Sequence, residues 1–339
     1  MKSPNSPEFH PTRLNGLTSV AEAAALIEAG LPLSIAGPEA ALDALPAGNW
    51  IGGTTSYFMT DAGGVVVDAD RVFVTDLSGF GEISFASYGA DELDRISGNG
   101  PDHGFSIAII PAQSTCHERF ALEAGNYPET FLRPTVGWIA GFDLREVGAS
   151  AKVYDGRGPY KHVERAVVAY VAQPEAALLA IEIVNPFVPG NGDVITFDAA
   201  GFTPATCFAN GVATGFADYL ALHGLGDGAL PLIGDFGGAH LNVSIKSVRS
   251  DDGHVELYAP VFPGVEYRFA APLSDYAGSF RDQLAKHADD GALWSCNCIL
   301  NFLFGKLENQ SIGGTAGPVT FGEIAYQLLN QTMVIVREQ

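Results

Sequence analysis

The sequence is poor in positive charge. Its 339 residues include 18 Lys and Arg against 39 Asp and Glu, which gives a formal net charge of −21. Such a chain repels nucleic-acid phosphates and anionic lipid headgroups at long range, so we expect neither as a partner. Charged residues make up only 17% and apolar residues 47%. This balance predicts a folded chain rich in buried strands, not a disordered acidic one.

Long hydrophobic runs and cysteines are also scarce. No segment approaches the roughly 18 unbroken apolar residues that a membrane-spanning helix needs. The start of the chain is polar and broken by prolines, so it lacks the apolar centre of a signal peptide. We therefore expect no membrane insertion. Four cysteines are too few for a disulfide scaffold in a chain of this length, which favours reduced thiols and a cytoplasmic location.

The order of predicted strands and helices indicates an α/β fold of the mixed α+β kind, with two halves that each contain a sheet. Residues 1–16 are expected to form a disordered arm. A glycine-rich stretch at 226–240 is the best candidate for a boundary, which we place near Gly234. The predicted domains are then 17–234 and 235–339.

Two capping patterns predict where helices begin. Ser19 and Glu22 have the spacing of a capping box before an apolar helical run. Thr115 and Glu118 repeat this spacing after the apolar strand FSIAIIPA. A strand followed directly by a helix is typical of α/β folds.

Two distant segments resemble each other. GGTTSYF at 52–58 and GPVTFGEIA at 317–325 both combine small residues with threonine and an aromatic residue in a strand-like context. Chance similarity and an internal duplication both explain the pattern at this stage.

The carboxyl-terminal part resembles a known family. SCNCILNF at 295–302 and GPVTFGEIAYQLLNQTMVIV at 317–336 are similar to the end of the FIST family, the F-box and intracellular signal transduction proteins. The matching positions are Cys296, Gly317, Thr320, Gly322, Glu323, Ile324, Asn330, Gln331 and Thr332. Upstream, WIGGTTSYFMTDAGGV looks like the family's amino-terminal strand and turn. The family more commonly has Gly-Cys-Ser-Thr where this chain has Gly52, Gly53, Thr54 and Thr55.

This resemblance implies a sensory module with FIST N-terminal-like and C-terminal-like halves. Such a module binds a small-molecule ligand, and this chain would signal through a separate protein partner because it carries no kinase, cyclase or receptor module. Some FIST proteins bind haem and sense nitric oxide, so haem is a candidate cofactor. A haem iron needs an axial His, Cys, Met or Tyr. His240, with apolar and glycine-rich flanks that suggest partial burial, is the first candidate.

The residues themselves also suggest a ligand site. Cys296 and Asn297 lie at the end of a predicted buried strand before a helix, where open α/β sheets place ligand crevices. Glu323 lies in an apolar strand and could anchor a ligand, because a buried carboxylate needs a partner or a raised pKa. We expect a pocket between the halves. Its predicted lining is Thr54, Thr55, Tyr57, Cys296, Asn297, Thr320 and Glu323.

Three alternatives involve the cysteines. Cys296 and Cys298 would lie on one face of a strand and could bind a soft metal, with His240 as a further candidate ligand. Cys296 or Cys116 could be the nucleophile of a hydrolase or transferase, and a helix start favours the thiolate of Cys116. His117 is a poor built-in base, since consecutive helical residues face different ways. The third reading is that these thiols are buried core residues.

Overall fold

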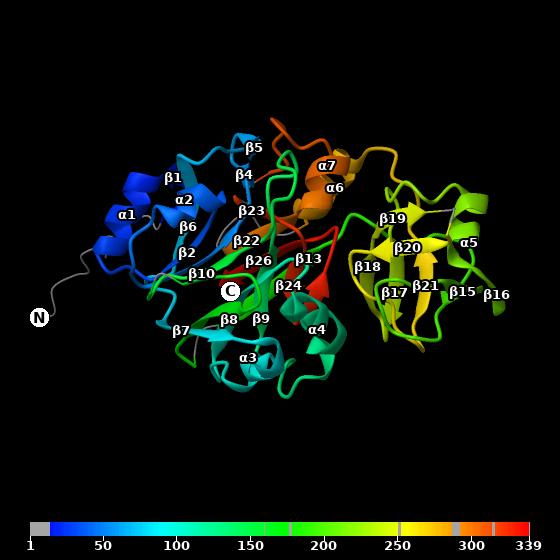
Figure 1. Cartoon of the computed structure of the whole chain (residues 1–339), viewed down its shortest axis with the longest axis horizontal. Helices are drawn as coiled ribbons and strands as arrows, with labels where there is room; N and C mark the ends of the chain where they lie inside the picture. The colour runs from blue at the N-terminus through cyan, green and yellow to red at the C-terminus, as the bar shows by residue number, and fades with distance from the viewer. Residues whose placement is uncertain are drawn as a thin grey trace, which may run out of the picture.

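The computed structural model describes residues 14–158, 160–175, 178–249, 252–286, 292–313 and 316–338. Within these residues the chain forms a mixed α/β fold with several sheets, which confirms the predicted fold class (Figure 1). In the same residues, no helix has the length and apolar character needed to cross a membrane.

The first sheet is built mainly from the amino-terminal part of the chain. Its order is β1 (Asn15–Ser19), β6 (Arg71–Asp76), β2 (Leu33–Gly37), β3 (Trp50–Thr54), β10 (Val153–Asp155) and β11 (Tyr160–His162). β2 and β3 run parallel. Helices α1 (Val20–Glu28) and α2 (Glu39–Asp43) follow β1 and β2. The predicted capping box is confirmed: Ser19 Oγ accepts from the backbone N–H of Glu22, and Glu22 Oε2 accepts from that of Ser19.

Two further sheets combine strands from both ends of the chain. One has the order β25 (Gln327–Leu329), β24 (Glu323–Ala325), β9 (Thr135–Ala140), β8 (Gly104–Pro111), β12 (Ala166–Ala172) and β7 (Glu82–Tyr88). The other has the order β13 (Leu179–Val184), β26 (Met333–Glu338), β22 (Ala292–Cys298), β23 (Gly317–Thr320), β4 (Tyr57–Thr60) and β5 (Gly63–Val66). The helical elements beside them are η1 (Ala90–Glu92), α3 (Arg95–Gly98), α4 (Thr115–Glu123), η2 (Ala124–Asn126), α6 (Tyr276–Leu284) and α7 (Ile299–Phe304).

One apolar cluster joins these three sheets. Phe73, Trp138 and Trp294 come from different sheets and are all buried in it. A Cβ atom at Gly53 would lie 2.7 Å from side-chain carbons of both Ile109 and Trp138. Glycine at this position therefore allows β3 to approach β8 and β9 closely.

A separate lobe lies between β13 and α6 in the sequence and at the right of Figure 1. Its sheet has the order β16 (Val212–Gly215), β15 (Thr206–Ala209), β14 (Ile195–Thr196), β21 (Glu266–Phe269), β17 (Leu232–Phe236) and β18 (Ala239–Val243). The hairpin of β19 (Ile245–Arg249) and β20 (His254–Leu257) and helix α5 (Phe216–His223) complete it.

The chain does not divide at Gly234 as predicted. Gly234 lies inside β17, which pairs with β21 on one side and β18 on the other. A break there would split the sheet of the lobe. The predicted units 17–234 and 235–339 also share two sheets, since β4 pairs with β23 and β9 pairs with β24. Glycine content indicated turns within the lobe, not a boundary.

Two smaller expectations need adjustment. Most of the predicted arm at 1–16 lies outside the described residues, and Asn15 and Gly16 begin β1. Helix α4 has Ser114 as its N-cap, one residue before the predicted Thr115. Ser114 Oγ accepts from the backbone N–H of His117 at 3.0 Å.

The two similar segments lie side by side. β4 pairs antiparallel with β23, and Tyr57 is opposite Val319. In each segment the chain leaves one sheet and enters the next just after a threonine: β3 leads to β4, and β23 leads to β24. The similarity in sequence thus corresponds to a similar local path of the backbone.

Candidate functional site

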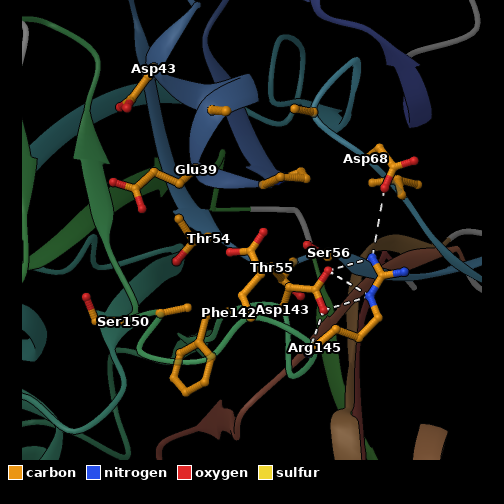
Figure 2. Close-up of a pocket in the computed structure, with 16 residues that line it drawn as sticks. Glu39, Asp43, Thr54, Thr55, Ser56, Asp68, Phe142, Asp143, Arg145 and Ser150 are labelled. Carbon is orange, nitrogen blue, oxygen red and sulfur yellow. Dashed lines mark hydrogen bonds and ion pairs between the residues drawn. The ribbon is translucent and has the colours of Figure 1, made fainter.

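Three strand ends converge on one open cavity, which we name the strand-end cavity (Figure 2). β2 and β3 are parallel neighbours, and the backbone N–H of Gly141, just after β9, donates to the carbonyl of Thr54 at 2.8 Å. Ligand crevices of open α/β sheets lie at such carboxyl ends. The cavity measures about 560 Å³, within the range of small-molecule sites. Residues of the segments 38–43, 54–56, 67–69 and 142–150 line it.

The two threonines predicted as ligand residues line this cavity, but their hydroxyls hold its walls together. Thr54 Oγ1 donates to the carbonyl of Gly141 at 2.6 Å and accepts from the backbone N–H of Lys152 at 2.9 Å. Thr55 Oγ1 donates to the carbonyl of Val319 at 2.7 Å. Both side chains are buried. They therefore fix where β3 ends relative to its neighbours.

Tyr57, the third predicted hydroxyl, lies behind the wall. Its hydroxyl accepts from the backbone N–H of Leu144 at 3.0 Å and lies 3.4 Å from Asp143 Oδ1. Burial raises the pKa of Tyr57, so it remains a neutral phenol. It positions the segment that carries Asp143 and does not face the cavity itself.

One charged cluster lies beside α2. Lys152 and Lys161 both pair with Glu39, and Lys161 also pairs with Asp43 at 2.8 Å. Burial alone would raise the pKa of Glu39, but hydrogen bonds from the two lysines lower it below its ordinary value. The Tyr154 hydroxyl donates to Asp43 at 2.8 Å. Both carboxylates are therefore held ionised at the rim.

A second charged cluster lies beyond the two threonines (Figure 2). Asp143 accepts two hydrogen bonds from Arg145, from Nε to Oδ1 at 2.9 Å and from Nη2 to Oδ2 at 2.6 Å. This guanidinium lowers the pKa of Asp143. Asp68 lies 3.9 Å from the same guanidinium and is almost fully exposed. The paired carboxylate and guanidinium give this end of the cavity donors and acceptors close together.

The remaining predicted residues are sealed elsewhere. They belong to a group that we name the buried polar cluster, which consists of Cys296, Asn297, Cys298, Asn301, Thr320, Glu323 and Thr332. Every member is buried, and none lines the strand-end cavity. The prediction of one hollow shared by residues 52–57, 296–298 and 320–323 was therefore wrong in its geometry. The chain brings the carboxyl-terminal residues together but leaves them no opening to this cavity.

Glu323 is the centre of this cluster. Its Oε2 accepts from the hydroxyl and the backbone N–H of Thr332 at 2.8 and 3.2 Å. Burial raises the pKa of Glu323 to about 8, although the hydrogen bonds from Thr332 oppose the shift. Its Oε1 is buried and has no hydrogen-bond partner among the described residues. Glu323 is thus a neutral, protonated carboxyl group near pH 7.

The thiols lack the properties of a nucleophile. Cys296 is fully buried and lies 3.4 Å from the carbonyl of Gly137, and burial raises its pKa well above the ordinary value. Burial also raises the pKa of Cys116 to about 11, and this thiol donates to the carbonyl of Glu164 at 3.3 Å. A reactive cysteine needs a stabilised, accessible thiolate. Both thiols fit the core reading instead.

The candidate metal ligands do not form a site. Across the described residues, no three His, Cys, Asp or Glu side chains come together in a way that could hold a metal ion. Cys296 and Cys298 are buried, whereas His240 is exposed on β18 of the lobe, which corrects its predicted partial burial. The soft-metal reading of these three residues therefore fails.

The strand-end cavity does not fit haem either. Haem iron takes an axial His, Cys, Met or Tyr and lies in an apolar pocket. The 16 residues that line this cavity include none of these four types, and many of them are charged or polar. The lining of this cavity therefore offers haem no axial ligand.

The charged residues of the cavity were missed at the sequence level. They are Glu39, Asp43, Asp68, Glu146, Asp143 and Arg145. A signal was present for the last pair, because Asp143 and Arg145 directly follow a strand of apolar residues that ends at Ala140. The carboxyl end of β9 is therefore a position where open α/β sheets place ligand crevices, as is the end of the cysteine strand.

A model of the family of unknown function DUF6976 matches residues 18–339. The match includes every residue of the strand-end cavity and of the buried polar cluster. No curated protein and no solved structure matches the chain.

Proposed function

Since the chain belongs to this family, whose description states no activity, we propose from the site itself that it binds a polar small molecule in the strand-end cavity. The observation that carries the proposal is the convergence of the segments after β2, β3 and β9 on one open cavity of about 560 Å³. Fixed charged side chains at two ends of such a cavity can orient a ligand. Binding of this kind needs no covalent chemistry.

The charges of the lining favour an uncharged or cationic polar ligand. The acidic side chains are Glu39, Asp43, Asp68, Asp143 and Glu146, and the basic one is Arg145. Lys152 and Lys161 neutralise part of the excess at one end. The remaining acidic excess matches the net charge of −21 of the whole chain and would repel an anionic ligand.

A sensory role is the second part of the proposal. It is supported by the resemblance of the sequence to the FIST family at Thr320, Glu323 and the segment 330–332. In this role the bound ligand would change how the protein meets a separate signalling partner. A cytoplasmic location is proposed with it, supported by four free, buried cysteines.

Native mass spectrometry of freshly purified protein tests the binding. We expect a retained small molecule whose mass is seen under native conditions and is lost on denaturation. Ala69 is exposed and lines the cavity, so Ala69→Trp places an indole in the ligand's space. This variant should purify without the ligand.

The matched control is Ala62→Trp, on the exposed turn between β4 and β5 and outside the lining. It should retain the ligand as the wild type does. A retained molecule that survives Ala69→Trp would place binding elsewhere. If no molecule is retained, a thermal-shift screen of polar amines and polyols decides, and stabilisation that is equal in both variants would refute the site.

A further inference from the structure

A second cavity lies where the lobe meets the body of the protein, and we name it the junction cavity. It measures about 450 Å³ and is separate from the strand-end cavity, with which it shares no lining residue. The start of α4 forms one wall. The loop 200–203 and strand β20 of the lobe form the other, and Phe321 joins from the body. Cavities at domain junctions are a common place for small-molecule sites.

The walls are mainly aromatic and aliphatic. Phe202 and Tyr258 come from the lobe, and Phe321 comes from the turn between β23 and β24. Leu122 and Leu257 add aliphatic surface. Aromatic side chains favour flat apolar molecules, since rings stack or meet edge to face.

His117 supplies a hydrogen-bond donor that has no acceptor. The backbone N–H of Gln113 donates to His117 Nδ1 at 3.3 Å, so the proton of the neutral imidazole lies on Nε2. That nitrogen is buried and has no hydrogen-bond partner among the described residues. It is the one such side-chain atom among the residues of this lining. A buried donor without an acceptor is costly, which makes an acceptor on a ligand favourable here.

The charges around the cavity favour a neutral ligand. Burial lowers the pKa of His117 to about 4, with a further contribution from Lys246, so the ring is uncharged near pH 7. Lys246 pairs with Glu256 at 3.2 Å, and Glu256 also meets His254. Glu118 adds another carboxylate to the lining. An anionic ligand would meet these carboxylates without a free cation on the lining to pair with it.

We propose that the junction cavity binds a neutral, planar aromatic molecule whose acceptor atom receives the Nε2–H of His117. The ring of Phe202 packs edge to face against His117, with centroids 6.2 Å apart. Phe202 is half-buried and belongs to the loop of the opposite wall. Its ring turns aside when the ligand's acceptor approaches Nε2. This site does not depend on the function proposed for the strand-end cavity.

The test uses two probes of nearly equal shape. 2-Acetylnaphthalene carries a carbonyl acceptor, and 2-isopropenylnaphthalene has a methylene group in its place. Saturation-transfer NMR on the full chain at pH 7.5 measures both affinities. We expect the ketone to bind roughly fivefold more tightly, the worth of one hydrogen bond. In protein labelled with ¹⁵N-histidine, the Nε2–H signal of His117 should move with the ketone and not with the alkene.

Two variants test whether His117 causes the difference in affinity between the two probes. His117→Phe removes the donor and should make the two probes bind equally. His223→Phe is the control, because His223 is exposed at the end of α5 and outside this lining; it should keep the fivefold preference. Equal binding of the probes to the wild type, or a preference that survives His117→Phe, overturns the hydrogen bond. Absence of saturation transfer to both probes overturns the cavity as a binding site. If His117→Phe fails to fold, the Nε2–H signal of His117 in the labelled wild type still tests the hydrogen bond.

Discussion

The strand-end cavity and the buried polar cluster are two solutions to the same topology. In each, a pair of parallel strands ends at one edge: β2 with β3, and β22 with β23. The first edge is left open, and the short helix α2, 5 residues long, forms one wall of the cavity there. The second edge is closed by the chain itself. A strand end stays open to solvent only where no other segment caps it.

The closing segment is the Asn-Gln-Thr stretch at 330–332. The carbonyl of Thr332 accepts from the backbone N–H of Cys298 at 3.1 Å and from Asn301 Nδ2 at 2.9 Å. Ser244 of the lobe lies 2.5 Å from both Asn330 Oδ1 and Gln331 Oε1. Asn330 and Gln331, two of the residues that carry the FIST resemblance, therefore join the body to the lobe. Asn330 Nδ2 donates to the carbonyl of Asn242 at 2.9 Å, whereas Gln331 Nε2 is buried without a hydrogen-bond partner among the described residues.

We expect the largest effect on stability from Glu323→Ala. It removes the acceptor of two Thr332 donors and leaves a void, so we expect the free energy of unfolding to fall by about 4 kcal/mol. Urea unfolding measures it. Glu323→Gln is the matched control, since an amide keeps the acceptor oxygen and the volume. A loss below about 1 kcal/mol in the alanine variant would mean that the cluster does not hold the fold.

The same carboxyl group predicts a pH dependence. Its pKa is about 8 in the folded chain against an ordinary 4.5, so folding favours the protonated form. The stabilisation is complete below about pH 4.5 and is lost as the pH rises toward 8, by about 1.4 kcal/mol for each unit. We expect the wild type to lose stability relative to Glu323→Gln between pH 5 and pH 8. Parallel curves for the two proteins would contradict this.

One hydrogen bond links the strand-end cavity to the strand that leads into the buried polar cluster. Thr55 Oγ1 donates to the carbonyl of Val319, which joins the wall of the cavity to β23. Thr55→Val keeps the shape and leaves that carbonyl without this donor, so we expect a loss of about 1–2 kcal/mol in urea unfolding. Thr60→Val is the comparison, because Thr60 is less buried and bonds locally to Gly63 in its own hairpin. Equal losses in both variants would remove the special role of Thr55.

The sequence predicted the class of fold because hydrophobic runs and caps are local. The capping box at Ser19 and the strand–helix step at Cys298 are both present. The sheet order was beyond reach, because β4 and β23 are more than 250 residues apart and their pairing depends on the whole fold. Thr55 and Val319 are likewise 264 residues apart in the sequence. Nothing local distinguishes a capped strand end from an open one.

Burial explains why two residues predicted to bind a ligand do not line the cavity. Glu323 and Cys296 were expected to face a ligand because a carboxylate and a thiol in apolar strands suggest chemistry. In the fold, burial keeps Glu323 neutral although hydrogen bonds from Thr332 oppose this, and the group is structural. The charged residues of the cavity follow buried strands instead: Glu39 follows β2 and Asp143 follows β9. The strand ends, not the unusual residues, carried the better signal.

We expect the smallest effect on stability at Asp68, at the open strand ends. Asp68 lines the strand-end cavity, is 92% exposed and lies 3.9 Å from Arg145. An ion pair of this exposure contributes little, so Asp68→Asn should change the free energy of unfolding by less than about 0.5 kcal/mol. Asp61→Asn, on an exposed turn outside the lining, is the control. Any cationic ligand retained by the wild type should bind Asp68→Asn more weakly at low salt. This difference in affinity should shrink as added salt screens the charge. A destabilisation as large as that of Thr55→Val would show instead that this rim is part of the structural core.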